Sequence, residues 1–384
     1  MAENSGRFPH SKVLLVEDNQ FNRDLVVAML ASLEIARIEC AVDGQDGLER
    51  LATFVPDLII LDIMMPRMDG FEFLRRIQQM PAFADIPILV TSALDEQRQR
   101  LQAFDLGASD YLSKPLERRE FAARVSVQLR NQALVARLKT HHEQVAQDME
   151  VAASMQRALL PSPRDLAKAG TNGIHVEAIF QPYEVIGGDL WGMLSLDGGR
   201  LCIYVVDFTG HGIPAAINTF RLHKMVEDCA GSGRGPGDIL TGLNRELHST
   251  LPRGQFAVMI CAVLDGDRLT VANAGAPPPL LWTGNEAAFL PVQSHPLAVV
   301  ADAAYSDVTV PFPEGSALLI YSDGLSEACD DGGGAFGEEG VRRLMGAMAD
   351  SKPLAEAFCK MFGAAYTMTD DITTVLVRRE PPTS

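Results

Sequence analysis

Residues 57–72 read DLIILDIMMPRMDGFE, and this stretch decides the fold of the first part of the chain. Its opening run is apolar without alternation and ends in a carboxylate, Asp62. A strand that is apolar at every position is buried on both faces, which is typical of a parallel sheet covered by helices. The other strand-like runs within residues 10–125 alternate with helical patterns in the same way. We therefore expect an α/β domain with a doubly wound, five-stranded parallel sheet.

The composition narrows the classes of function. The chain has 384 residues, 47% of them hydrophobic, and a formal net charge of −17. This length suggests two or three domains, and the negative charge argues against nucleic acid or an anionic membrane surface as the main partner. The six cysteines form no C-x-x-C pair, so a thiolate zinc site is not expected. The sequence has no signal-peptide pattern and no run of about 18 apolar residues, which predicts a cytoplasmic protein.

Acidic, hydroxyl and ammonium side chains follow the predicted strands of the first domain. Glu17 and Asp18 end the first strand, Asp62 the third, Ser92 the fourth and Lys114 the fifth. The carboxyl ends of the strands form the ligand crevice of such a sheet, so these groups should converge there. Neighbouring carboxylates repel one another, and a bound Mg²⁺ would relieve that repulsion. Asp62 could then attack a phosphorus atom while Lys114 balances the developing charge and Ser92 binds the acyl phosphate.

The motifs LLVEDN, DLIILDIMMPRMDGFE, VTSALDE and DYLSKP closely resemble the receiver domains of two-component response regulators, over residues 10–128. The resemblance implies that Asp62 is the phosphoacceptor and that a sensor histidine kinase or phosphotransfer protein phosphorylates it. It implies switch roles for Ser92, favoured over its neighbour Thr91, and for Tyr111. The ligands that it implies for Mg²⁺ are Glu17, Asp18, Asp62 and the backbone carbonyl of Met64.

Residues 129–160 carry no strand pattern, and we expect a helical linker that ends at Pro161 and Pro163. A seam of eight positions, six of them apolar, recurs at spacings of three and four residues. These positions are Val135, Leu138, His142, Val145, Met149, Ala152, Gln156 and Leu159. Such a heptad pattern predicts a coiled coil that pairs the linker in a homodimer. The alternative is a surface helix that docks on one domain.

Residues 161–379 are rich in strand patterns separated by helical ones, which predicts an α+β domain of two packed sheets flanked by helices. Residues 1–9 and 380–384 are expected to be a flexible N-terminus and a C-terminal tail. Within this domain, residues 204–216 read YVVDFTGHGIPAA. An apolar strand ends there in Asp207 and is followed by glycines, which let other groups approach the backbone closely. His211, within this turn, is a possible proton donor or a structural residue.

Four further acidic residues lie beside predicted strand ends of the same domain. They are Asp189, Asp323, Asp370 and Asp371. Together with Asp207 they could form a two-metal centre, in which carboxylates bridge two divalent cations about 3.5–4 Å apart. The cations would lower the pKa of a bridging water and polarise a phosphoryl oxygen.

The pieces QRALLP, VIGGDL, VVDFTGHGIPAA, NAGAPPPLL, YSDGLSEA and DDITTVLV resemble the SpoIIE/RsbU-like branch of the metal-dependent serine/threonine phosphatases, the PPM superfamily. The resemblance implies two Mn²⁺ or Mg²⁺ ions, with Asp207 as the bridging catalytic ligand. Its other implied ligands are Asp189, the Phe208 carbonyl, Asp323 and Asp370, with Asp371 the less favoured of its pair. Two positions depart from the family pattern: Gly192 replaces an expected acid and Ala276 an expected histidine, and both could weaken metal or substrate affinity.

These resemblances together imply a response regulator whose phosphorylation controls a phosphatase. Its substrate would be a phosphoserine or phosphothreonine protein, by family analogy a STAS-type anti-sigma-factor antagonist. The alternative is a receiver-controlled binding module with a degenerate, inactive phosphatase domain, and Gly192 and Ala276 favour that alternative. The sequence does not fix the sign of the regulation.

Overall fold

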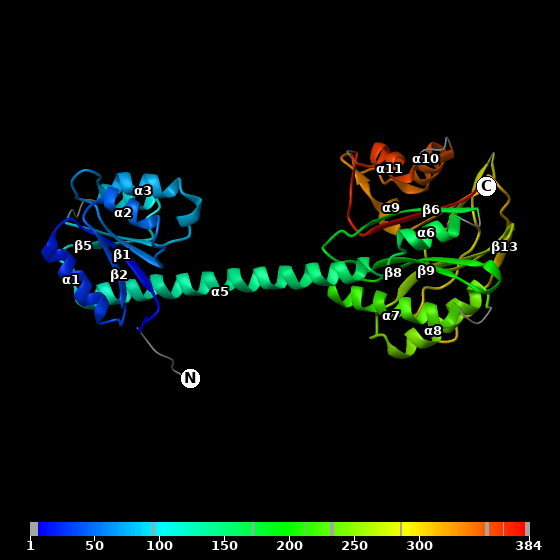
Figure 1. Cartoon of the computed structure of the whole chain (residues 1–384), viewed down its shortest axis with the longest axis horizontal. Helices are drawn as coiled ribbons and strands as arrows, with labels where there is room; N and C mark the ends of the chain where they lie inside the picture. The colour runs from blue at the N-terminus through cyan, green and yellow to red at the C-terminus, as the bar shows by residue number, and fades with distance from the viewer. Residues whose placement is uncertain are drawn as a thin grey trace. The chain divides into compact units, whose positions relative to one another are not determined.

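The computed structural model describes residues 7–93, 97–170, 173–210, 212–230, 234–284, 286–349, 353–363 and 365–380 (Figure 1). The chain divides into two compact units, residues 1–144 and 145–384. The first is an α/β unit and the second is built mainly of antiparallel strands, as expected from the sequence.

A five-stranded parallel sheet with the strand order β2-β1-β3-β4-β5 forms the centre of the first unit. The strands are β1 (Lys12–Val16), β2 (Arg37–Ala41), β3 (Leu58–Asp62), β4 (Ile88–Ser92) and β5 (Asp110–Ser113). The helices are α1 (Gln20–Ala31), α2 (Gly44–Leu51), α3 (Gly70–Gln78), α4 (Gln97–Asp105) and the start of α5 (Arg118–Arg157), with a short 3₁₀ turn, η1 (Pro81–Phe83). Apolar residues of α1 and α5 pack on one face of the sheet, and those of α2, α3 and α4 on the other. The predicted doubly wound fold is confirmed.

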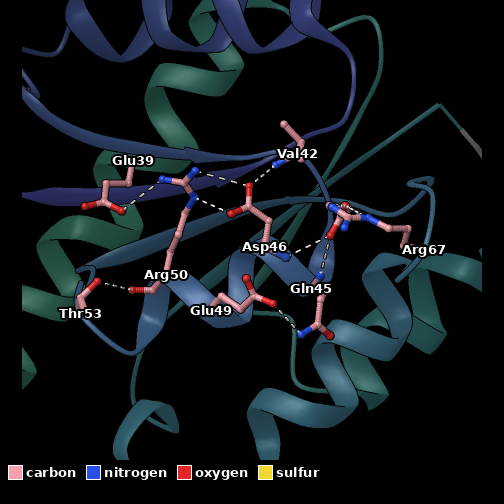
Figure 2. A network of polar contacts seen from close by, with 9 residues as sticks. Glu39, Val42, Gln45, Asp46, Glu49, Arg50, Thr53 and Arg67 are labelled. Carbon is pink, nitrogen blue, oxygen red and sulfur yellow. Dashed lines mark hydrogen bonds and ion pairs between the residues drawn. The ribbon is translucent and has the colours of Figure 1, made fainter.

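A polar network holds α2 against the loop that follows β3 (Figure 2). The buried Asp43 carboxylate caps α2 by accepting hydrogen bonds from the backbone N–H groups of Gln45 and Asp46, and Arg67 pairs with its other oxygen. Burial alone would raise the pKa of Asp43, but these partners outweigh it and lower that pKa. The Asp46 carboxylate in turn accepts from Arg50, one turn along the helix. Because Arg67 belongs to the loop after Asp62, the network fixes the backbone beside the predicted phosphoacceptor.

Helix α5 runs without a break from the last helix expected in the first domain through most of the predicted linker. The sequence between Pro115 and Pro161 contains neither glycine nor proline, so nothing in it interrupts the helical hydrogen bonds. The predicted heptad seam divides into two parts along this helix. Val135, Leu138 and Val145 are exposed, whereas Gln156 is buried in the second unit. The second part of the seam therefore behaves as the docked helix of the alternative interpretation.

Two five-stranded antiparallel sheets pack face to face in the second unit. The first has the order β13-β10-β9-β8-β7 and the second β12-β11-β14-β17-β6. Their strands are β6 (Ile174–Gln181), β7 (Asp189–Ser195), β8 (Leu201–Phe208), β9 (Ala257–Asp265), β10 (Arg268–Ala274), β11 (Leu280–Trp282), β12 (Ala287–Phe289), β13 (Val308–Pro311), β14 (Ala317–Tyr321) and β17 (Ile372–Arg379). A separate pair is formed by β15 (Cys329–Asp330) and β16 (Tyr366–Thr367).

Helices cover the outer face of each sheet. Figure 1 shows α7 and α8 along the sheet that contains β8 and β9, and the apolar residues of these elements form one core cluster. Residues of α9, α10 and α11 pack on the outer face of the other sheet. The helices of this unit are α6 (Pro163–Gly170), α7 (Ile213–Ala230), α8 (Pro236–Thr250), α9 (Asp323–Glu327), α10 (Gly337–Ala349) and α11 (Leu354–Met361), with a short 3₁₀ turn, η2 (Asp197–Gly199). The predicted two-sheet α+β architecture is confirmed.

Helix α6 begins at Pro163, one of the two prolines that were expected only to end the linker. Pro163 occupies its first position, where the missing N–H costs nothing. The Ser162 and Asp165 side chains exchange hydrogen bonds with each other's backbone N–H groups, which is a capping box. The sequence S-P-R-D therefore carried a helix-start signal that the sequence interpretation missed. Strands β12 and β13 were also missed because they are short edge strands.

Candidate functional site

The groups predicted at the carboxyl ends of the parallel strands lie together in the first unit. Carboxylate oxygens of Glu17, Asp18 and Asp62 lie within 4.8 Å of one another. Glu17 and Asp62 are buried, whereas Asp18 is exposed. Lys114 Nζ donates to Glu17 Oε2 at 2.7 Å and to Asp62 Oδ2 at 2.8 Å. Three carboxylates and one ammonium leave an excess of negative charge, which fits a hard divalent cation with oxygen ligands.

The electrostatics of this pocket oppose full ionisation of Asp62. Burial, together with the negative charge of Glu17, raises the pKa of Asp62 although Lys114 acts in the opposite direction. Burial disfavours the Lys114 ammonium, but its hydrogen bonds to Asp62 and Glu17 outweigh that effect and raise the pKa of Lys114. The ammonium therefore stays charged while it contacts the carboxylate that is the predicted nucleophile.

The remaining predicted receiver residues lie around the same strand ends. Ser92 is fully buried as the last residue of β4. Its neighbour Thr91 directs its hydroxyl to the backbone carbonyl of Leu61. The Met64 backbone N–H lies 3.4 Å from Asp62 Oδ1, while the Met64 side chain is exposed. Tyr111 lies largely buried in β5.

Two residues that the sequence interpretation missed support the acidic end of β1. Asn22 Nδ2 donates to Glu17 Oε1 at 2.8 Å. Arg23 Nη1 donates to the backbone carbonyls of Glu17 and Asp18 at 2.7 Å each. Both lie in the first turn of α1, directly after the Glu-Asp-Asn stretch, so their position in the first turn of the expected helix was the available signal. They orient the two acidic residues without contacting Asp62.

The predicted acids of the second unit also come together. Asp189 and Asp207 are directly paired on the neighbouring antiparallel strands β7 and β8. Asp207, Asp323 and Asp370 line one cavity of about 480 Å³. The other residues lining it are Tyr183, Glu184, Phe208, Thr209, Gly210, Phe256, Val258 and Thr369. In the part of the chain that the structure describes, no three of these acids meet the 4.8 Å spacing found in the first unit.

Asp189 carries the strongest sign that a cation belongs in this site. It is only 1% exposed, and among the described residues neither carboxylate oxygen has a hydrogen-bond partner. Burial and the charge of Asp207 raise the pKa of Asp189 well above its ordinary value, although the nearby Thr373 and Ser322 hydroxyls act in the opposite direction. Burial, with the charges of Asp323 and Asp370, raises the pKa of Asp207 to about 8. An unpartnered buried carboxylate is costly, and a metal ion would remove that cost.

Gly188 has no side chain, which leaves room beside the Asp207 carboxylate. A Cβ on Gly188 would lie 2.5 Å from the Phe208 carbonyl oxygen and 3.2 Å from Asp207 Oδ1. Only glycine permits that approach. The Phe208 carbonyl, a predicted ligand, thus lies next to the Asp207 carboxylate. His211 lies outside the described residues.

The two acids that precede β17 have different surroundings. Asp370 is exposed on the cavity. The buried Asp371 carboxylate accepts hydrogen bonds from the backbone N–H groups of Tyr183 and Gly188, at 2.8 and 2.7 Å. Asp371 thereby ties β17 to the loop before Asp189, and this geometry favours Asp370 over Asp371 as a ligand.

The two departures from the family pattern are not among the described residues that line the cavity. Gly192 is three residues after Asp189 and therefore faces the opposite side of β7. A Cβ at Gly192 would lie 2.3 Å from the ring of Tyr204, whose hydroxyl contacts His223 Nδ1 at 2.6 Å. The backbone of Ala276 exchanges hydrogen bonds with the Asn273 side chain, and Ala276 is not among the described residues that line the cavity. Strand alternation thus directs Gly192 to α7, and an effect of this position on metal or substrate affinity stays a prediction.

Two family models match the chain, one in each unit. The model of the response regulator receiver domain matches residues 13–126. The model of stage II sporulation protein E (SpoIIE) matches residues 197–380, which include Asp207, Asp323 and Asp370 but not Asp189.

Curated relatives match the first unit. The DNA-binding dual master transcriptional regulator RpaA of Synechocystis sp. is 37% identical over 134 residues, which are 34% of this chain and 54% of RpaA. The response regulator PleD of Caulobacter vibrioides is 38% identical over 115 residues, 30% of this chain and 25% of PleD. The chain thus covers 54% or less of the length of these relatives.

Solved structures match the second unit. The SiaA-PP2C domain of Pseudomonas aeruginosa is 24% identical with a TM-score of 0.55, over 62% of this chain and 98% of that domain, which shows a shared fold. The structure of the RsbU and RsbW domains of Rv1364c from Mycobacterium tuberculosis is 25% identical with a TM-score of 0.49, over 55% of this chain and 61% of that one. No described helix has both the length and the hydropathy needed to cross a bilayer.

Proposed function

We propose that this chain, a response regulator receiver domain joined to a SpoIIE-type phosphatase domain, is a signalling enzyme in which phosphorylation of Asp62 controls a metal-dependent protein serine/threonine phosphatase. The observation that carries the proposal is that Asp207, Asp323 and Asp370 line one cavity. The buried Asp189 lies opposite Asp207 on the neighbouring strand, and its carboxylate accepts no hydrogen bond from the described residues.

The receiver step would use the pocket at the ends of β1, β3, β4 and β5. An Asp62 oxygen would attack the phosphorus of a phosphohistidine, and the histidine nitrogen would leave. Glu17, Asp18, Asp62 and the Met64 carbonyl would hold Mg²⁺, which supplies positive charge to the transferring group. Lys114 already contacts Asp62 and would bind an oxygen of the phosphoryl group, and the Ser92 hydroxyl would bind another. Tyr111 would report the change by moving its ring.

The phosphatase step would use the acidic cavity. Asp207 would bridge two Mn²⁺ or Mg²⁺ ions, with Asp189, the Phe208 carbonyl, Asp323 and Asp370 as further ligands. When bound, two such ions supply a nucleophilic hydroxide and polarise the phosphoryl oxygens of a phosphoester. The chain contributes a fixed cluster of carboxylates and the open space beside Gly188. The open cavity suits a phosphoserine or phosphothreonine side chain of a protein.

The partners follow from the two activities. A sensor histidine kinase or phosphotransfer protein would supply the phosphoryl group. A STAS-type anti-sigma-factor antagonist is the proposed substrate, by analogy with SpoIIE-type phosphatases alone. Exposed apolar residues of α5, namely Leu134, Val135 and Leu138, would pair the chain with a second copy in a cytoplasmic homodimer.

Hydrolysis of p-nitrophenyl phosphate by the full chain with Mn²⁺ tests the phosphatase. Turnover that is lost on chelation is expected, and no turnover with a well-folded protein would favour a binding module with an inactive phosphatase domain. That alternative rested on Gly192 and Ala276, which are not among the described residues that line the cavity. Control by the receiver is tested with a candidate phosphoprotein, with and without beryllofluoride as a phosphoryl mimic at Asp62. Equal rates of the wild type with and without beryllofluoride would exclude that control, and Asp62→Asn is the control variant that beryllofluoride should not affect.

A further inference from the structure

Gln156 is a buried polar residue near the end of a largely exposed helix. Its side chain is 1% exposed, and it projects from the last turn of α5 into the second unit. Its Nε2 donates to the backbone carbonyls of Gly187 at 2.9 Å and Asp189 at 3.3 Å. The same nitrogen lies 3.3 Å from Thr219 Oγ1 in α7, and Gln156 Oε1 lies 3.5 Å from the Gly187 N–H. One amide therefore joins three separate segments.

The surroundings of this amide are small and apolar. Ala153 of α5, Ile186 of the loop before β7 and Ala216 of α7 form a buried cluster. Thr219 Oγ1 donates to the Ala216 carbonyl at 2.7 Å, so the hydroxyl is fixed within its own helix and can accept from Gln156. In such dry surroundings a backbone carbonyl that loses its hydrogen bond is destabilised, because no water replaces the lost donor. The amide is thus important for holding the loop in its observed conformation.

The loop that Gln156 holds is the one that presents Asp189. Other contacts of this loop include the Asp371 carboxylate, which accepts from the Gly188 N–H, and the Phe208 N–H, which donates to the Gly188 carbonyl. Asp189 is also paired with Asp207 where β7 begins. The hydroxyls of Thr373 and Ser322 act on the Asp189 carboxylate, but neither makes a hydrogen bond of normal geometry to it, so its position depends mainly on its backbone. Asp371 fixes that backbone from one side of the loop, and Gln156 fixes it at Gly187 and Asp189.

We propose that Gln156 is a positioning residue for the metal site: its amide fixes the Gly187–Asp189 backbone so that the Asp189 carboxylate is held toward Asp207. The inference rests on the proposed function of Asp189 as a metal ligand. Groups that bind a metal ligand and fix its orientation are important for metal binding. Their loss lowers metal affinity or activity about 10–100-fold. In the sequence Gln156 is a polar interruption of the heptad pattern and the first residue of the QRALLP motif, but neither pattern shows which backbone groups its amide contacts.

The test compares Gln156→Met with the matched control Gln147→Met in the full-length protein. Gln147 lies on the exposed surface of the same helix. Metal-free protein is examined by amide hydrogen exchange, and Mn²⁺ binding by isothermal titration calorimetry. We expect Gln156→Met to raise the exchange rate of the Gly187 amide and to weaken Mn²⁺ binding about tenfold or more. Gln147→Met should match the wild type in both measurements.

A purely structural role for Gln156 predicts a different result. The variant would then melt at a lower temperature, but well below that temperature its Gly187 exchange and its Mn²⁺ affinity would equal those of the wild type, which would overturn the proposal. If Gln156→Met does not fold, Gln156→Asn replaces it, because the shorter amide cannot reach both carbonyls. Failure of the proposed function appears separately, as wild-type protein that binds no Mn²⁺. The exchange measurement on metal-free protein still decides whether Gln156 fixes the loop.

Discussion

Replacing Asp207 by asparagine should stabilise the metal-free protein. Burial and the neighbouring charges of Asp323 and Asp370 raise the pKa of Asp207 to about 8, against 3.8 for an ordinary aspartate. Between these two values the folded protein binds more protons at this site than the unfolded protein does. Folding stability therefore falls as the pH rises from about 4 to 8. Asparagine has the same shape and no charge, so Asp207→Asn removes this loss.

The expected gain in the free energy of unfolding follows from the raised pKa of Asp207. At pH 7 the difference of about 3 pH units above the ordinary pKa corresponds to about 4 kcal/mol, at 1.36 kcal/mol per unit. Local relaxation and sharing of protons among the acids reduce this upper bound. We expect a gain of about 1–3 kcal/mol in the free energy of unfolding, or roughly 3–10 °C in the melting temperature of the second unit.

The assay is thermal unfolding of the full-length protein, measured by calorimetry from pH 5 to 8 with a chelator that keeps the protein free of metal. The wild type should lose stability with rising pH, and Asp207→Asn should show a flatter profile. Mn²⁺ should stabilise the wild type strongly and the variant weakly, because ligands that bind the native state stabilise it. Asp302→Asn, an exposed aspartate of the same unit, is the matched control. A metal-free Asp207→Asn protein less stable than the wild type at pH 7 would refute the reasoning.

Other predictions concern both sites. Mn²⁺ affinity should rise by up to about tenfold per pH unit between pH 6 and 8, because the ion displaces a proton from Asp207; calorimetric titration with no pH dependence would contradict this. Lys114→Met should destabilise the first unit by about 3 kcal/mol without Mg²⁺ and much less with it, measured by urea unfolding. Gly188→Ala should abolish Mn²⁺ binding through its clash with the Phe208 carbonyl, whereas Gly346→Ala, with open space around it, should not. Asp371→Asn should lower the melting temperature and weaken Mn²⁺ binding by about tenfold, because the loop before Asp189 loses an anchor, whereas complete loss of Mn²⁺ binding would make Asp371 a ligand.

The elements of the fold were largely predictable because their patterns are local. Uniformly apolar runs such as residues 58–61 specified buried parallel strands, and the structure has all five in the expected places. Short edge strands such as β13 lack that signal, since half of each lies in solvent. Helix α5 was divided in the prediction between a domain and a linker. The sequence contained the reason for its continuity, which is the absence of glycine and proline after Pro115.

The kinds of residue at the sites were predictable for a different reason. A single carboxylate at a strand end is more often a capping or surface group, so Asp62 and Asp207 were recognisable only from the joint pattern of several acids and from the family motifs around them. The sequence did not reveal which way neighbouring residues face. Gly192 looked like a vacant ligand position, but it lies on the opposite side of β7, against Tyr204. Asp370 and Asp371 are adjacent in sequence, yet one faces the cavity and the other binds backbone N–H groups.

The sequence by itself determined two domains, their strand order of appearance and the acidic chemistry at their strand ends, because apolar periodicity and residue type are properties of short segments. The tertiary structure alone decided which distant groups support that chemistry. The Asp371 carboxylate reaches the Gly188 N–H across 183 residues, and the Gln156 amide reaches the Gly187 carbonyl across 31. Hydrogen bonds depend on distance and angle between atoms in space, and no local pattern records which distant backbone groups will meet.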